Sequence, residues 1–323
     1  MQKLTKNVSG YMAVVTVLVL YFVNTLVYKL IPEGPMHDWG YYLLSGTLTV
    51  AIAVVIPIVF GYDINGRAGI RVKPDLVTSF LVVLSGCLLM VFGLGYSNIL
   101  YYLLELIGYT SVTTLPVMKS TGEILLAFLS LAILPALGEE LLVRGSIFTS
   151  LKGSVGTKRA VLFSALFFAL MHGSVAQLGH QFLVGLVCAV FVVIGGSVWY
   201  GVILHLTNNA VTVGLNVINS ASTLTATPTA EQFFTSWSFP ACIALCVLGL
   251  IGVYFVIRYA LRRRLGESAH GSRKILSTLS LLEEKPDYEW TDKSQNRIFY
   301  ASLIALGLLV VVDFVVVLCG GTL

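Results

Sequence analysis

Long apolar runs, each about the 20 residues that a helix needs to cross a lipid bilayer, make up most of this chain. Of its 323 residues, 57% are hydrophobic and only 11% are charged, against about 25% charged in an ordinary soluble domain. We therefore expect an all-α fold, a polytopic transmembrane bundle of about eight to nine helices. The runs cover residues 9–30, 39–60, 77–101, 123–150, 160–173, 177–195, 198–219, 236–260 and 298–319.

Basic residues gather on alternate connections between these runs. One set of connections carries Lys3, Lys6, Arg67, Arg71, Lys73, Lys152, Lys158, Arg159, Arg258, Arg262, Arg263, Arg264, Arg273 and Lys274, and the other little more than Lys29 and Lys119. The positive-inside rule then predicts a cytoplasmic N-terminus and a cytoplasmic Lys152–Arg159 loop. Nine spans would place the C-terminus outside, whereas a re-entrant segment within 160–219 would place it inside. The net charge of +4 belongs to these loops, so no nucleic-acid partner is expected.

Three charged residues stand inside the fourth apolar run: Glu139, Glu140 and Arg144. A charge at the centre of a bilayer costs roughly 2.5 to 3.5 kcal/mol on insertion scales, so such residues point to a functional site. Two polar groups follow them on later runs, His172 on one and the His205–Asn209 stretch on another. Gln177 and His180 follow His172, at the expected extracytoplasmic start of a helix, where hydration is sufficient to explain them.

Helix length predicts that the first two of these groups meet at one depth. Glu139 lies thirteen residues before Lys152, and His172 lies thirteen residues after Arg159. At 1.5 Å per residue, both side chains are roughly 20 Å below the surface that the Lys152–Arg159 loop occupies. Two antiparallel helices that leave this surface together would therefore bring Glu139 beside His172.

The third group reaches a similar level from the same surface. A turn at Gly195–Ser197 places His205 and Asn209 roughly 12 and 18 Å deep. Because they are four residues apart, their side chains share one face of the helix. We expect this face to meet Glu139 and His172.

Helical geometry also separates the two adjacent glutamates. Consecutive residues are about 100° apart around a helix, so Glu139 and Glu140 cannot face one pocket equally well. Arg144 is four residues after Glu140, which predicts a Glu140–Arg144 ion pair that leaves Glu139 free to act as a base. Pro135 is expected to bend this helix and help to open a wet cavity.

The expected pocket suits water activation. A carboxylate in a partly apolar cavity holds a proton more readily than one in water, and an adjacent imidazolium opposes this effect. Glu139 and His172 are therefore candidates to activate water, and His205 and Asn209 to stabilise an oxyanion. The same Glu139, His172 and His205 could instead hold zinc with water as the fourth ligand. Asn209 is a poor zinc ligand, which favours the metal-free mechanism, without a cofactor.

Three spaced motifs carry a resemblance to a known family. Glu139-Glu140-x-x-x-Arg144, Phe168-x-x-x-His172 and His205-x-x-x-Asn209 resemble the motifs of the CAAX prenyl protease and bacteriocin-processing (CPBP, or Abi) family of intramembrane proteases. The resemblance covers roughly residues 123–219. It implies a membrane-embedded catalytic core in which Glu139 and His172 activate water, His205 and Asn209 stabilise the oxyanion, and Glu140, Arg144 and Phe168 support them.

These interpretations divide the chain into N-terminal helices at 1–122, a CPBP/Abi-like core at 123–219, and C-terminal helices at 220–323 with a charged cytoplasmic linker at about 262–297. The expected activity is that of an intramembrane endopeptidase, acting among membrane lipids on a membrane-associated protein or peptide, prenylated or not. Two alternatives stay open: a non-proteolytic bacteriocin-immunity or scaffold protein of the same fold, and a transporter with a Glu/His relay. A transporter would favour repeated halves, which the sequence does not show.

Overall fold

The computed structural model describes residues 9–19, 21, 24–32, 37–109, 116–118, 120–221, 229–264 and 294–319. Its helices are α1 (Ser9–Leu18), α2 (Asn24–Leu30), α3 (His37–Val59), α4 (Ile64–Arg67), α5 (Leu76–Leu106), α6 (Thr121–Ala127), α7 (Leu134–Glu140), α8 (Thr149–Val155), α9 (Thr157–Leu170), α10 (Val175–Gly195), α11 (Trp199–Ala221), α12 (Ala230–Thr235), α13 (Ser238–Arg264) and α15 (Ser294–Leu318), with π-helical segments η2 (Phe128–Ile133) and η3 (Leu141–Phe148). The described residues contain no strand, which confirms the expected all-α class.

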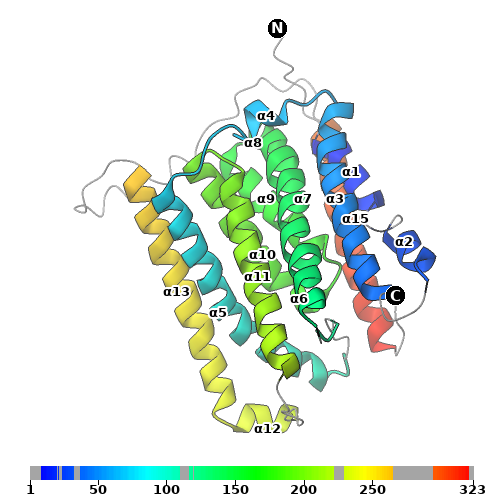
Figure 1. Ribbon diagram of the computed structural model, residues 1–323, viewed down its shortest axis with the longest axis vertical. Helices are drawn as coiled ribbons and strands as arrows, with labels where there is room; N and C mark the ends of the chain where they lie inside the picture. The colour runs from blue at the N-terminus through cyan, green and yellow to red at the C-terminus, as the bar shows by residue number, and fades with distance from the viewer. Residues whose placement is uncertain are drawn as a thin grey trace.

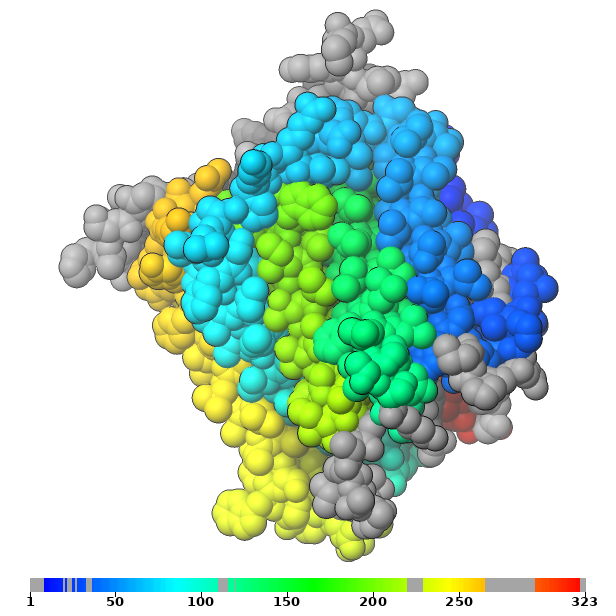
Figure 2. Space-filling model, in the orientation of Figure 1, coloured from blue at the N-terminus to red at the C-terminus, as the bar shows by residue number. Residues whose placement is uncertain are grey.

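The long helices stand side by side, with α4 at one end of the bundle and α12 at the other (Figure 1). The space-filling view in the same orientation shows these helices packed against one another (Figure 2). These ends are called the α4 end and the α12 end. Within the described residues, seven helical segments are long and apolar enough to cross a membrane: 37–59, 76–106, 121–155, 175–195, 199–219, 238–264 and 294–318. The chain is therefore a multi-pass membrane protein.

Two of the expected spans are shorter than the hydropathy pattern indicated. The run at 9–30 contains the short helices α1 and α2, and the run at 160–173 becomes α9, which has 14 residues. A helix of 14 residues is about 21 Å long and does not cross a hydrocarbon core of about 30 Å. Gly173, with a φ of 68°, lies between α9 and α10 and supplies the left-handed conformation at that turn. Most of the expected cytoplasmic linker, residues 265–293, lies outside the described residues.

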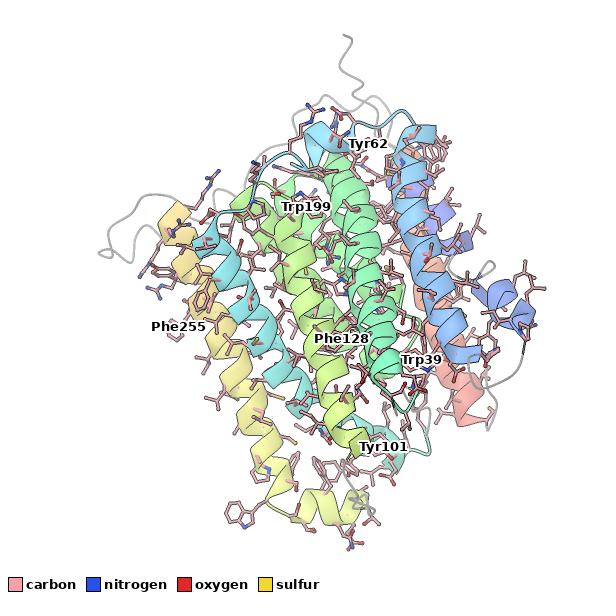
Figure 3. The ribbon with its side chains drawn as sticks, in the orientation of Figure 1. Trp39, Tyr62, Tyr101, Phe128, Trp199 and Phe255 are labelled. Carbon is pink, nitrogen blue, oxygen red and sulfur yellow. The ribbon has the colours of Figure 1, made fainter. Side chains whose placement is uncertain are left out.

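Small residues allow the helices to pack closely. A Cβ added to Gly138 of α7 would lie 2.8 Å from the Val50 backbone nitrogen of α3. A Cβ added to Gly249 of α13 would lie 2.7 Å from the Phe92 backbone nitrogen of α5. In lipid, where helix association depends on van der Waals contact, such close approach is a main source of stability. The outward faces stay apolar: Phe255 of α13 is 58% exposed and points away from the bundle (Figure 3).

The segment that carries the two glutamates is a helix interrupted twice by π-helical turns. Segment η2 precedes α7 and η3 follows it, and Pro135 lies in the first turn of α7. Proline lacks a backbone donor, and the π-helical segment η2 ends just before Pro135; the bend expected at this residue stays a prediction. Wider turns of this kind are frequent at functional sites. Here they set the directions of the side chains from Glu139 to Arg144.

Asp75 joins three helices at the α4 end. Its carboxylate caps α5 by accepting from the Thr78 backbone nitrogen at 3.0 Å, accepts from the Tyr200 hydroxyl of α11 at 3.0 Å, and lies 2.9 Å from the Arg263 guanidinium of α13. Burial raises the pKa of Asp75, but these hydrogen bonds and the Arg263 charge outweigh burial and hold the pKa below its ordinary value. The ionised form of Asp75 is therefore the stabilising one.

We expect Asp75→Ala to lower the free energy of unfolding by about 1 kcal/mol at pH 7, the usual cost of losing a helix cap. Because the folded-state pKa is lowered, the contribution of the carboxylate is present above about pH 3.9 and is lost as the pH falls through the lowered value. The ion pair between Asp75 and Arg263 adds little to the free energy of unfolding, because both side chains are partly exposed. Thermal unfolding in detergent, compared at pH 7 and pH 3, measures this effect. An equal deficit at both pH values would contradict it; Glu231→Gln, on the exposed surface of α12, is the control.

Candidate active site

Glu140 and Arg144 form a fully buried ion pair, as the sequence predicted. The Arg144 guanidinium donates to Glu140 Oε1 at 2.7 Å, and both side chains have no solvent exposure. A second guanidinium nitrogen donates to the Gly185 carbonyl of α10 at 2.8 Å. The guanidinium carbon also lies 4.3 Å from the centre of the Phe168 ring, a cation–π contact. Arg144 thus ties its own segment to α9 and α10.

Glu139 turns the other way, towards His172. Its Oε2 lies 4.0 Å from His172 Nε2, and the two side chains are 17% and 19% exposed. This oxygen has no hydrogen-bond partner among the described residues. The structure therefore brings together the two residues that depth arithmetic paired.

The His172 ring is held by the backbone of its own helix. Nδ1 lies 2.8 Å from the Phe168 carbonyl oxygen, which can only accept, so Nδ1 carries a proton and donates it. In the neutral imidazole, Nε2 then carries the lone pair that faces Glu139. Two acceptors cannot hydrogen-bond to each other, which agrees with the separation of 4.0 Å.

His205 lies beside Glu140 and not beside Glu139. Its Nδ1 is 3.3 Å from Glu140 Oε1, and the His205 side chain is 3% exposed. The Phe168 ring meets His172 and His205 edge-on, at centroid separations of 5.0 and 5.4 Å. Phe168 is thus in contact with both histidines as well as Arg144.

The structure adds two residues that sequence reasoning missed. Asn208 donates from Nδ2 to Asn209 Oδ1 at 3.3 Å, a contact that does not use the Asn209 amide hydrogens. Its only sequence signal was that it stands next to Asn209. Gly185 contributes a backbone carbonyl, a contact that no sequence pattern indicates.

A cavity of about 1140 Å³ contains the candidate residues on its wall: Glu139, His172, His205, Asn208 and Asn209. Gln177 and His180, which hydration alone was expected to explain, also line this cavity. His180 has an Nε2 atom that is buried and without a partner among the described residues. These two residues therefore belong to the polar wall of the cavity.

The donors expected for zinc do not gather into a ligand set. His205 faces Glu140 with Nδ1, while Glu139 faces His172. Within the described part of the chain, no three His, Cys, Asp or Glu side chains are placed to share a metal ion. The arrangement of Glu139, His172 and His205 does not fit the three-ligand zinc site that the sequence left open.

We expect Gly201→Ala to disturb this site through a steric clash. Gly201 of α11 faces the ion pair, and a Cβ there would lie 2.5 Å from Glu140 Oε2, which must move. Overpacking of this kind costs typically 1–3 kcal/mol, measurable by thermal unfolding in detergent. Gly214→Ala on the same helix is the matched control, because a Cβ there meets no atom within 4 Å. Equal stability of the two variants would contradict the clash.

Comparison with known proteins identifies this part of the chain. Residues 121–211 match the model of a family described as type II CAAX prenyl endopeptidase Rce1-like. No curated protein and no solved structure matches the chain. The match covers less than a third of the chain and includes all three motifs, so residues 121–211 form a domain that is similar to the Rce1-like CAAX prenyl endopeptidase family, the CPBP or Abi family.

Proposed function

We propose that this protein is an intramembrane endopeptidase that hydrolyses a peptide bond of a membrane-associated protein or peptide. The observation that carries the proposal is the pairing of Glu139 with His172 on the wall of the cavity, 4.0 Å apart and without a direct hydrogen bond. The family domain at 121–211 supports a peptidase as the class of enzyme.

A water molecule between the two side chains completes their hydrogen bonding. It donates one hydrogen to the Glu139 carboxylate and the other to the neutral Nε2 of His172, which leaves its lone pairs free to attack a carbonyl carbon. Glu139 then takes the proton as general base and returns it to the amine as the peptide bond breaks. His172 orients the water, and its own orientation is fixed through Nδ1.

The developing oxyanion needs hydrogen-bond donors on the same wall. Asn209 offers its amide hydrogens, because Asn208 occupies its oxygen. His205 has its Nδ1 beside Glu140 and offers Nε2 as a donor when the ring is protonated.

Purified wild-type protein and Glu139→Ala in detergent test this proposal. Each is incubated with a diverse peptide pool that includes prenylated members, and the products are identified by mass spectrometry. We expect products from the wild type that are absent with Glu139→Ala and are retained with Glu231→Ala, a glutamate on the exposed surface of α12. Retention of activity in a chelator would agree with the misfit of the zinc ligands. No cleavage by folded wild-type protein would instead favour the immunity or scaffold alternative.

A further inference from the structure

The cavity extends from the α12 side of the bundle to about the middle of its helices. The lining residues run from Tyr41 to Thr49 on α3 and from Met90 to Leu104 on α5, and on α11 they run from His205, before the midpoint of that helix, to Asn219. Tyr101, on the cavity wall, lies near the α12 end, whereas Tyr62 and Trp199, which do not line it, lie near the α4 end (Figure 3).

The α4 end is closed by the chain segment that follows α4. The Val198 backbone nitrogen donates to the Ala68 carbonyl at 2.9 Å, and the Trp199 indole donates to the Ile70 carbonyl at 2.8 Å. Ser197 Oγ also donates to the Val72 carbonyl at 2.9 Å, and Ser197 has no solvent exposure. These bonds hold the segment across the turn between α10 and α11. No residue of this segment or of this turn lines the cavity, which separates the cavity from the α4 end.

The two ends of the bundle also differ in their charged residues. Among the described residues, the helix ends and connections at the α4 end carry Arg67, Arg71, Lys73, Lys152, Lys158, Arg159, Arg258, Arg262, Arg263, Arg264 and Arg297. The short helix α2, which precedes the opposite end of α3, carries Lys29. The acidic residues Asp38, Glu105, Glu123 and Glu231 lie at the ends of helices that meet the α12 end. The positive-inside rule counts Lys and Arg near the ends of spans, and it assigns the α4 end to the cytoplasm.

We propose that the cavity opens to the extracytoplasmic side, and that its substrate is an extracytoplasmic segment of a membrane-anchored or exported polypeptide. The substrate class rests on the proposed function, whereas the side of opening does not. Uncharged polar side chains on the wall fit this substrate: Tyr41, Ser45, Ser97, Asn98, Gln181 and Asn216. Carboxamides and hydroxyls both donate and accept, so they match the alternating groups of an extended peptide backbone.

With this orientation, a prenylated C-terminus that is anchored at the cytoplasmic leaflet cannot enter the cavity. A prenylated C-terminal cysteine, often preceded by basic residues, is held at the anionic cytoplasmic leaflet. That leaflet adjoins the closed α4 end of this protein. A cytoplasmic prenylated C-terminus therefore does not meet the opening of the cavity.

Cysteine labelling in intact bacterial host cells tests the side of opening. The five native cysteines are replaced, and single cysteines are introduced as Ser97→Cys, an exposed position on the cavity wall, and Lys158→Cys, an exposed position at the α4 end. With a membrane-impermeant maleimide, we expect at least tenfold more labelling of Ser97→Cys than of Lys158→Cys in intact cells, and equal labelling after lysis. The reverse pattern would overturn the proposal.

A second measurement uses the unmodified chain and separates the two proposals. Charged, membrane-impermeant peptides are added to right-side-out and to inverted membrane vesicles that contain the wild type or Glu139→Ala. Cleavage in right-side-out vesicles only, lost with Glu139→Ala, supports both proposals. Cleavage in inverted vesicles only would overturn the orientation and leave the protease intact. Absence of cleavage in both, with labelling as expected, would count against the protease alone.

Discussion

Arg144→Met is expected to lower the free energy of unfolding by about 3–5 kcal/mol, the cost of leaving one member of a buried ion pair without its partner. Methionine has a similar apolar length but cannot donate to Glu140 Oε1 or to the Gly185 carbonyl. Glu140 has no solvent exposure, so water does not replace the lost donor. The cation–π contact with Phe168 is lost in the same change.

Thermal and denaturant unfolding in detergent measure this effect. Lys158→Met, at an exposed position, is the matched control and should change stability by less than about 0.5 kcal/mol. The double variant Glu140→Gln with Arg144→Met removes both charges and should recover part of the loss, because neither charge is then left unpaired. A single Arg144→Met variant within 1 kcal/mol of wild type would show that the pair does not hold the site together.

Local spacing predicted the parts of the site that lie within one helix or at one depth. The interval of four residues gave the Glu140–Arg144 contact, and equal chain lengths from the basic loop gave the approach of Glu139 to His172. Both were predicted from regular helical rise and rotation, and the Glu140–Arg144 contact forms even though Arg144 lies in the π-helical segment η3.

Contacts that depend on irregular backbone could not be predicted from the sequence. Segment η3 changes the rotation of the chain after Glu140, and a pattern of apolar residues carries no mark of a π-helical turn. The placement of His205 beside Glu140 also needed the structure, because it depends on how α11 packs against α7. Hydropathy also averages over long windows, so it did not separate α1 from α2 or show that α9 is short.

Glu139→Gln is expected to reduce kcat by about 10²–10⁴-fold, the usual contribution of a general base, while the stability stays close to that of the wild type. The amide has the size of the carboxylate but takes no proton from water. Removing the charge of Glu139 leaves no hydrogen-bond donor without its acceptor at Oε2, because Glu139 Oε2 has no hydrogen-bond partner among the described residues. Steady-state cleavage and thermal unfolding of the same preparation measure both quantities.

The adjacent Glu140→Gln variant provides the matched control, because it makes the same chemical change one residue away. Glu140 is bound to Arg144 and lies 3.3 Å from His205, so its neutralisation leaves a buried guanidinium without a counter-charge and should cost several kcal/mol of stability. The two variants should therefore differ in which property they lose. Glu139→Gln should fold normally with a strongly reduced kcat, whereas Glu140→Gln should be unstable. An active Glu139→Gln enzyme, or equal stability losses in the two variants, would show that Glu139 is a structural residue and would remove the general base from the mechanism.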